Sequence, residues 1–336
     1  MKKAGTTFIK NLRYLCLAGV IALGLMTIIG TGGGGGGGTT PSPTIGSGHF
    51  VIGGVYTALY TSDGSSATQI PSLDGSAATY YGIAAGNGLI VLVGVDQIAA
   101  PIGEIACGTD LNGTFTRSHQ SGEVFRDVAF GNSSFVAVSM PSQTARVWTF
   151  SNCTGFNIID FSPADWLSSV TFGNGTFVMS GNDDLAGNHT FWYSLDNGAT
   201  WADTPLMADS IRNVRFGNNT FVAVGRDSNV TTAWVSADGI NWTGYSMVVD
   251  GDTRDVAYGN GRWVAVGGNR VWWSDDNGIT WQSKAVTSNY LWAIAFGNGL
   301  FVAVGDLGTV LASSDGENWA TYGHGGGGLR SIAYIP

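Results

Sequence analysis

The sequence predicts an all-β chain folded as a seven-bladed β-propeller with four-stranded antiparallel blades. A hairpin of two short apolar strands around a Gly-Asn turn recurs along the chain. Successive Gly-Asn pairs are 38 to 45 residues apart, which is close to the length of one propeller blade. One strand of the first repeat is missing at its start and is found instead at the end of the chain, as a closed ring requires.

The composition agrees with many short strands joined by turns. The 336 residues include 52 Gly and 8 Pro, while 12% are aromatic and 12% charged. The aromatic and β-branched residues form short runs, so the glycines between them are typical of turns. The apolar content of 44% is sufficient for a large core.

The N-terminal segment has the layout of an export signal. Basic residues precede an apolar run at 14–30, and small residues follow from Thr31. We therefore expect residues 1–31 to be a signal sequence or an N-terminal membrane anchor that tethers the protein. Residues 32–46, rich in Gly, Thr and Pro, are expected to be a flexible linker. The expected location is the periplasm, the cell surface or the extracellular medium.

The propeller at residues 47–336 is acidic. Four of the 15 basic residues precede residue 47, so 11 remain against 24 acidic residues, a net charge of −13. Nucleic acid is therefore excluded as a partner, because phosphate contacts need clustered Lys and Arg. We expect a monomer.

The last complete repeat shows the elements of one blade in order. A short apolar strand, Ile294–Phe296, leads into Gly297-Asn298-Gly299, whose residues tolerate the positive φ of a tight hairpin. The second strand, Phe301–Val304, is apolar at every position, which predicts burial of both faces between neighbouring blades. A third strand is expected at Thr309–Ala312, and a fourth strand carrying Trp319.

Counting second strands gives seven blades. They begin at Phe50, Ile90, Phe135, Phe177, Phe221, Trp263 and Phe301. No first strand precedes Phe50, but Leu329–Ile335 matches one and has no second strand after it. This strand is expected to pair with the first blade and close the ring, which removes an exposed sheet edge. An open solenoid is the alternative, and it would need capping repeats.

The turn after the third strand has a signature of its own. It is Ser-x-Asp-Asn-Gly-x-Thr-Trp at Ser194–Trp201 and Ser274–Trp281, and it is one residue shorter at Ser236–Trp242 and Ser313–Trp319. Asp196 and Asp276 are expected to accept backbone N–H groups of their own turns. The Trp is expected to fix the turn on the sheet by burying its ring.

This turn resembles the Asp-box (BNR) repeat of sialidase-like propellers, S-x-D-x-G-x-x-W. Together with the Gly-x-Phe-Val-Ala-Val-Gly strand, the chain is most similar to photosystem II assembly-factor-type propellers and to uncharacterised bacterial envelope propellers. The resemblance covers residues 47–336 and implies a binding or assembly module. A glycan-active hydrolase or lyase of the sialidase-like superfamily is the alternative.

No set of catalytic residues can be singled out. The Arg-Ile-Pro motif of sialidases is absent, and the propeller has no arginine before Arg117. No Cys and His spacing fits zinc, and no calcium or phosphate loop is found, so we expect neither a metal nor a cofactor. Two carboxylates with divergent pKa values on the channel side would favour the hydrolase.

One position of the inner strands stands out as a candidate ligand-binding site. Four of the ten propeller arginines share it, at the strand end that should form one mouth of the central channel. These arginines are expected to recognise a carboxylate on a protein or an acidic glycan, with aromatic residues as platforms. Alternatively, Arg126 and Arg254 pair with Asp127 or Asp255 of neighbouring blades and hold the ring together. We call this position the collar: Tyr81, Arg126, Ser168, Arg212, Arg254, Trp292 and Arg330.

Cys107 and Cys153 are the two cysteines of the propeller. They fall near the end of the third strand in adjacent repeats. A disulfide between them is compatible with export, and the sequence leaves open whether it forms.

Overall fold

The structure, a computed structural model, describes residues 48–74, 76–96, 101–141, 144–183, 188–247 and 251–336. The predicted signal or anchor at 1–31 and the linker at 32–46 lie outside these residues. No helix within these ranges is long and apolar enough to cross a membrane.

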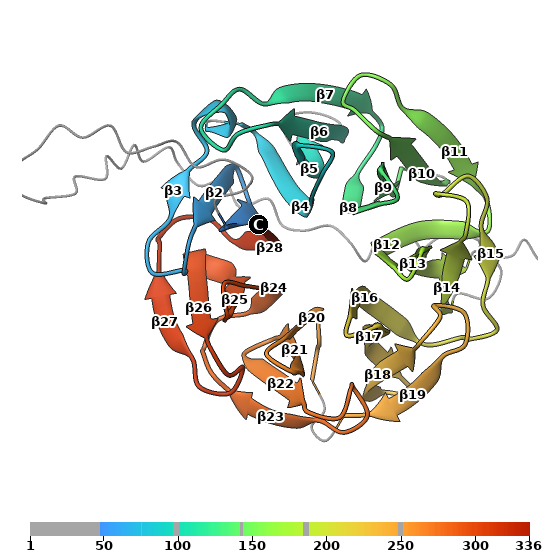
Figure 1. Cartoon of the computed structure of the whole chain (residues 1–336), viewed down its shortest axis with the longest axis vertical. Helices are drawn as coiled ribbons and strands as arrows, with labels where there is room; N and C mark the ends of the chain where they lie inside the picture. The colour runs from blue at the N-terminus through green and yellow to red at the C-terminus, as the bar shows by residue number, and fades with distance from the viewer. Residues whose placement is uncertain (1–47, 75, 97–100, 142–143, 184–187, 248–250) are drawn as a thin grey trace, which may run out of the picture. The chain divides into compact units, whose positions relative to one another are not determined.

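Within the described residues the strands form seven antiparallel sheets of four strands arranged around a centre (Figure 1). Each sheet is one blade, as predicted from the repeat. From the inner to the outer strand the blades are β28, β1, β2, β3 (Leu329–Ile335, His49–Gly54, Thr57–Thr61, Thr68–Gln69); β4 to β7 (Ala78–Gly86, Leu89–Asp96, Ile102–Gly108, Thr116–Ser121); β8 to β11 (Phe125–Gly131, Ser134–Ser139, Ala145–Phe150, Asn157–Phe161); β12 to β15 (Ala164–Gly173, Thr176–Asp183, His189–Ser194, Ala202–Asp203); β16 to β19 (Ser210–Gly217, Thr220–Asp227, Val230–Ser236, Thr243–Ser246); β20 to β23 (Asp255–Gly259, Arg262–Gly267, Arg270–Ser274, Gln282–Ala285); and β24 to β27 (Leu291–Gly297, Leu300–Gly305, Thr309–Ser313, Ala320–Gly323).

The last strand closes the ring as the sequence predicts. β28 pairs antiparallel with β1, and the register places Phe50 opposite Tyr334 and Ile52 opposite Ile332. The first blade therefore contains both ends of the propeller domain, and the alternative of an open solenoid is excluded.

Asparagine has two structural roles in the hairpin between the first and second strands. Its φ is close to +50° at Asn87, Asn174 and Asn298, the left-handed conformation expected for this turn. The side chain then reaches the next blade: Nδ2 of Asn87 donates to the carbonyl of Ser133, and Nδ2 of Asn298 donates to the carbonyl of Gly48. The Gly-Asn pair thus shapes the hairpin and ties neighbouring blades together.

The core lies between the blades. Val302 and Val304 of the second strand β25 are fully buried, and so are their neighbours Phe301 and Ala303 on the opposite face. The prediction of a strand buried on both faces is confirmed. The hydrophobic clusters join adjacent blades, since Val302 packs in one cluster with Ile52 of the first blade.

A pair of one glycine and one aromatic ring recurs where inner strands of adjacent blades meet. The inner strand ends in glycine, and the aromatic residue of the next blade lies on it. A Cβ added to Gly131 would lie 2.1 Å from the ring of Phe172, and one added to Gly86 would lie 2.2 Å from that of Phe130. Six interfaces share this arrangement: Gly86–Phe130, Gly131–Phe172, Gly173–Phe216, Gly217–Tyr258, Gly259–Phe296 and Gly297–Tyr334.

At the seventh interface, where the ring closes, the large residue stands at the glycine position and the small residue at the aromatic position. Ile335 stands at the glycine position of the first blade, and Ala85 at the aromatic position of the second. Ile335 is 2% exposed, and Ala85 packs against the cluster that contains it. A large residue and a small one have therefore exchanged places across the closing interface.

The Asp-centred turns have the predicted local bonds. Oδ1 of Asp276 accepts the N–H of Thr280 at 2.8 Å, and Oγ of Ser274 accepts the N–H of Gly278 at 2.9 Å. The ring of Trp281 is buried, and its Nε1 donates to the carbonyl of Gly278. One detail of the prediction is wrong, because Trp319 precedes β27 instead of lying within it. The turn, which Trp319 covers, extends one residue further than the pattern suggested.

Cys107 of β6 and Cys153, in the turn after β10, form a disulfide between the second and third blades. The bond was left open by the sequence, because adjacent repeats do not by themselves fix the distance between two side chains.

Candidate functional site

The collar residues lie in the first half of the inner strands, except for Arg254, which directly precedes β20. All seven inner strands stand around the centre of the ring (Figure 1). The collar divides into two groups of side chains in contact. One contains Arg254, Trp292 and Arg330, and the other contains Tyr81 and Arg126. Ser168 joins neither group, because its hydroxyl bonds to Ser180 in its own blade.

Trp292 is the centre of the first group. The guanidinium carbons of Arg254 and Arg330 lie 4.9 and 4.6 Å from the centroid of its ring. Arg254 also lies 5.4 Å from the ring centroid of Tyr290, which precedes β24. Contacts of this kind attract the cation to the aromatic face and hold the guanidinium plane in place.

Two aspartates from neighbouring loops neutralise part of the positive charge. Oδ2 of Asp252 accepts from Nη2 of Arg254 at 2.6 Å, and Oδ1 of the same carboxylate lies 3.8 Å from Nε of Arg212. Asp306 accepts from Nη1 of Arg330 at 2.6 Å and from Nε1 of Trp292 at 2.9 Å. The arginine and tryptophan of the collar can thus bind one carboxylate together.

Arg126 differs from the other collar arginines. Its guanidinium lies 5.3 Å from the ring centroid of Tyr81, and among the described residues it has no carboxylate partner. Its Nε is buried and donates to no acceptor there. Burial lowers the pKa of Arg126, which Tyr81 only partly opposes. A half-buried cation without a carboxylate partner is costly, so this group is the strongest anion-binding candidate of the mouth.

The structure corrects the alternative in which Arg126 and Arg254 pair with Asp127 or Asp255. Arg215, a residue that the sequence analysis did not select, takes both acids. Its Nη1 lies 3.0 Å from Oδ2 of Asp127, and its Nε lies 3.5 Å from Oδ1 of Asp255. Arg126 and Arg254 belong to the mouth, whereas Arg215 lies deeper along the inner strand.

A signal for Arg215 was present in the repeat. In the first blade this position is Ala333, the fifth residue counted from Leu329. Arg215 is the equivalent residue of its own blade, and the other blades have Ala or Thr at this position. We call this position the chamber column: Ala84, Ala129, Thr171, Arg215, Ala257, Ala295 and Ala333.

Bonds to the backbone fix the two acids beside Arg215. Asp127 accepts the N–H of Val170 in the next blade, and Asp255 accepts that of Ile294. Burial raises the pKa of Asp255 to about 6, although Arg215 and two backbone N–H groups lower it. Burial disfavours the charge on Arg215, but the two carboxylates raise its pKa above the usual value, so it stays a cation.

Arg215 and Asp127 stand at the boundary between two hollows of the channel. The upper hollow, beside the collar, is about 40 Å³ and is lined by Tyr81, Trp292 and Arg330 among others. The lower hollow is about 310 Å³ and is lined by residues further along the inner strands. Arg215 and Asp127 line both.

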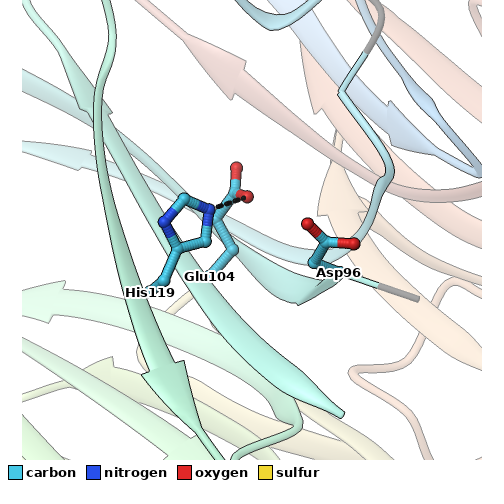
Figure 2. A group of neighbouring side chains, drawn as sticks. All are labelled: Asp96, Glu104 and His119. Carbon is cyan, nitrogen blue, oxygen red and sulfur yellow. Dashed lines mark ion pairs between the residues drawn. The ribbon is translucent and has the colours of Figure 1, made fainter. Parts of the chain in front are cut away.

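A separate cluster of Asp96, Glu104 and His119 has the composition of a metal site, with candidate ligand atoms within 4.8 Å of one another. Figure 2 shows His119 directed at the Glu104 carboxylate. Both oxygens of Glu104 already accept from Arg117, at 2.8 and 2.6 Å, and one also accepts from Tyr80. Because a guanidinium fills the place of a cation, the cluster is better described as an ion-pair network around the buried Glu104 carboxylate.

Comparison with known proteins identifies no family. No family model matches, and no curated protein does. Solved structures share the fold at low identity. A catalytically inactive virginiamycin B lyase from Staphylococcus aureus with quinupristin has a TM-score of 0.60 and 12% identity, covering 74% of this chain and 85% of that one. YCF48 bound to D1 peptide has a TM-score of 0.56 and 17% identity, covering 73% and 82%. The WD40 propeller domain of Doa1 has a TM-score of 0.56 and 11% identity, covering 77% and 87%.

Proposed function

We propose that this chain is a non-enzymatic binding or assembly module that recognises a carboxylate on a protein at its collar. Arg126 is the observation that carries the proposal, since this cation lacks a carboxylate partner within the described residues and has a buried donor without an acceptor. The neighbouring pair of Arg330 and Trp292 shows how such a site holds a carboxylate, because it already binds Asp306.

A protein partner is favoured over a free small molecule by the shape of the site. The upper hollow of about 40 Å³ is far smaller than a typical ligand pocket, at roughly 300 to 1,000 Å³. A carboxylate presented by a chain lying across the mouth needs no deep pocket. A similar propeller, YCF48, was solved bound to D1 peptide. An acidic glycan offers the same carboxylate and is the second ligand to test.

We also propose that the protein acts outside the cytoplasm, with residues 1–31 as its export signal or membrane tether. The disulfide between Cys107 and Cys153 supports this location, because such bonds persist in oxidising compartments. The Asp-centred turns, with their Ser, Gly and Trp bonds, support kinship with Asp-box propellers.

A sialidase-like hydrolase remains the second candidate, because Asp127 and Asp255 form a channel-side pair of acids. The raised pKa of Asp255 is a feature that a general acid needs. Three observations oppose this role. Arg215 lies between the two carboxylates, backbone N–H groups occupy both of them, and the hollow beside Asp255 is about 40 Å³. A sugar cannot reach both acids without displacing Arg215.

The test compares binding of acidic peptides and uronic acid oligosaccharides to the wild type and to Arg126→Gln by isothermal titration calorimetry. A charge-assisted hydrogen bond is worth about 1.5–3 kcal/mol, so Arg126→Gln should weaken binding by about 10- to 150-fold. Arg126→Lys keeps the charge and loses the planar fork, and it should fall between the two.

Arg262→Gln is the matched control, since Arg262 begins β21 at the opposite end of its blade and pairs with Asp275. Its affinity should equal that of the wild type. An equal loss in Arg126→Gln and Arg262→Gln would show that charge in general, and no site at the collar, drives binding. Hydrolysis of an oligosaccharide that Asp255→Asn abolishes would replace the proposal by the hydrolase.

A further inference from the structure

The lower hollow of the channel, which we call the chamber, is a cavity that the collar does not use. Its volume of about 310 Å³ would hold about ten waters at roughly 30 Å³ each, and it falls at the lower end of the range for ligand pockets. The small side chains of the chamber column leave this space open. Its ligand would therefore be the size of one small ring.

Aromatic side chains form the rim of the chamber. Five of them line it, and each comes from a different blade. The glycine of the preceding blade lies against each ring, and a Cβ built on that glycine would lie 2.1 to 3.0 Å from the nearest ring atom. Each ring also packs against the aromatic residue of the second strand in its own blade, with ring centroids 4.7 to 5.3 Å apart, so the rings are held in place before any ligand arrives. The rim residues are Phe130, Phe172, Phe216, Tyr258 and Phe296.

The wall of the chamber also offers hydrogen bonds. Each inner strand is the last strand of its sheet, so the edge that faces the centre has backbone N–H and C=O groups without a strand partner. Arg215 and Thr171 add a guanidinium and a hydroxyl. The N–H groups of Val170 and Ile294 already donate to Asp127 and Asp255. A hydrocarbon ligand would leave the other edge groups unpaired, at a cost of about 1–3 kcal/mol each.

The charge of the chamber is balanced. Arg215 and Asp127 line it and pair with each other at 3.0 Å, whereas Asp255 lines the upper hollow alone. A ligand anion would meet Asp127, and a ligand cation would meet Arg215. The chamber thus favours an uncharged ligand that has both hydrogen-bonding groups and an apolar face.

We propose that the chamber binds one uncharged sugar ring, with its C–H groups against the edges of the aromatic rim and its hydroxyls on the strand edges and Arg215. A pyranose combines these properties in a volume that the cavity can hold. The site lies on the other side of Arg215 from the collar, so it goes beyond the proposed carboxylate recognition and does not depend on it.

The test uses glucose and N-acetylglucosamine as neutral probes, and glucuronic acid and glucosamine as charged probes of the same size. Saturation-transfer NMR and titration calorimetry should show binding of at least one neutral probe, with the charged probes at least fivefold weaker. Ala333→Val narrows the chamber at a partly exposed position and should weaken binding of the neutral sugar at least fivefold. Ala320→Val, the same change at an exposed position of the outer strand β27, should leave affinity unchanged.

A crystal structure of the wild type with the bound neutral sugar gives a readout that needs no variant. Electron density for the sugar ring inside the aromatic rim supports the proposal. This result stands even where Ala333→Val does not fold, because the crystal contains the wild type. The proposal is overturned if no neutral probe binds at 10 mM, if charged and neutral probes bind equally, or if the ring is found elsewhere. Loss of collar binding in Arg126→Gln bears on the other site only, so the two proposals fail separately.

Discussion

The exchange of a large and a small residue at the closing interface predicts how substitutions there change the stability of the ring. Six interfaces place an aromatic ring on a glycine, and the seventh has Ile335 and Ala85. If Ile335 fills the space that a ring fills elsewhere, then Ala85→Phe inserts a phenyl group into occupied space. Overpacking of this kind costs about 1–3 kcal/mol of unfolding free energy.

The reverse change opens a cavity. Ile335→Gly removes a side chain that is 2% exposed, which costs about 2–5 kcal/mol, and glycine in a strand adds about 0.5–1 kcal/mol. The double variant restores the arrangement of the other six interfaces, because the new ring can lie on the new glycine. We therefore expect it to be more stable than the sum of the two single changes by about 2 kcal/mol.

Urea unfolding followed by tryptophan fluorescence and circular dichroism measures all three variants, with the m-value as the check on two-state behaviour. Ala85→Phe combined with Phe216→Ala, a change in a distant interface, is the control and should be additive. If Ala85→Phe and Ile335→Gly are also additive within about 0.5 kcal/mol, then the two positions do not share space and our account of the closing interface is wrong.

Three further predictions concern stability. Reducing the disulfide between Cys107 and Cys153 frees a segment of 46 residues and should lower the unfolding free energy by about 4 kcal/mol, because the unfolded chain gains loop entropy. Urea unfolding midpoints with and without a reductant measure this change, and equal midpoints would contradict it. Trp281→Ala should cost about 3–5 kcal/mol, because the ring is 1% exposed, and a loss below about 0.5 kcal/mol in the same titration would refute its role in fixing the turn. Burial and the nearby Arg212 lower the pKa of His189 to about 4, so the folded protein binds fewer protons than the unfolded chain between pH 6.5 and 4. His189 therefore contributes about 3 kcal/mol of stability above pH 6.5, and this contribution is lost as the pH falls from 6.5 through 4. The difference in unfolding free energy between wild type and His189→Asn should shrink over the same pH range. A constant difference would show that His189 titrates normally.

The repeat alone was enough to predict the fold, because each blade has the same sequence pattern. A degenerate copy in one blade could therefore be interpreted from the better copies in the others. The second strand begins at or within one residue of the predicted position in every blade, as for Phe50 in β1 and Phe301 in β25. Closure by Leu329–Ile335 followed from counting strands, which needs no knowledge of side-chain contacts.

The candidate site was predicted only as a position. Alignment of the inner strands placed Arg126, Arg254 and Arg330 at one mouth, but the aspartates that pair with Arg254 and Arg330 come from loops that the repeat does not describe. Asp252 and Asp306 lie in such loops, and nothing in the spacing of the blades indicated that they would face the collar. Charge pairing across a ring depends on side-chain direction, and a periodic sequence does not determine that.

The inner strand also explains how one ring can hold the two binding sites that we propose. The positions that pack between blades are nearly uniform: the glycine and aromatic pairs recur in six interfaces, and the one exception changes both partners together. The collar and the chamber column are where single blades depart from the repeat, as Trp292 and Arg215 do, and the partners of these residues are acids at the channel: Asp306 for Trp292, and Asp127 and Asp255 for Arg215. Both residues line the channel and lie outside the hydrophobic clusters that join the blades. A propeller built this way can change what it binds at either end of the channel while its interfaces stay the same, so departures from the repeat are the first places to look for function in similar rings.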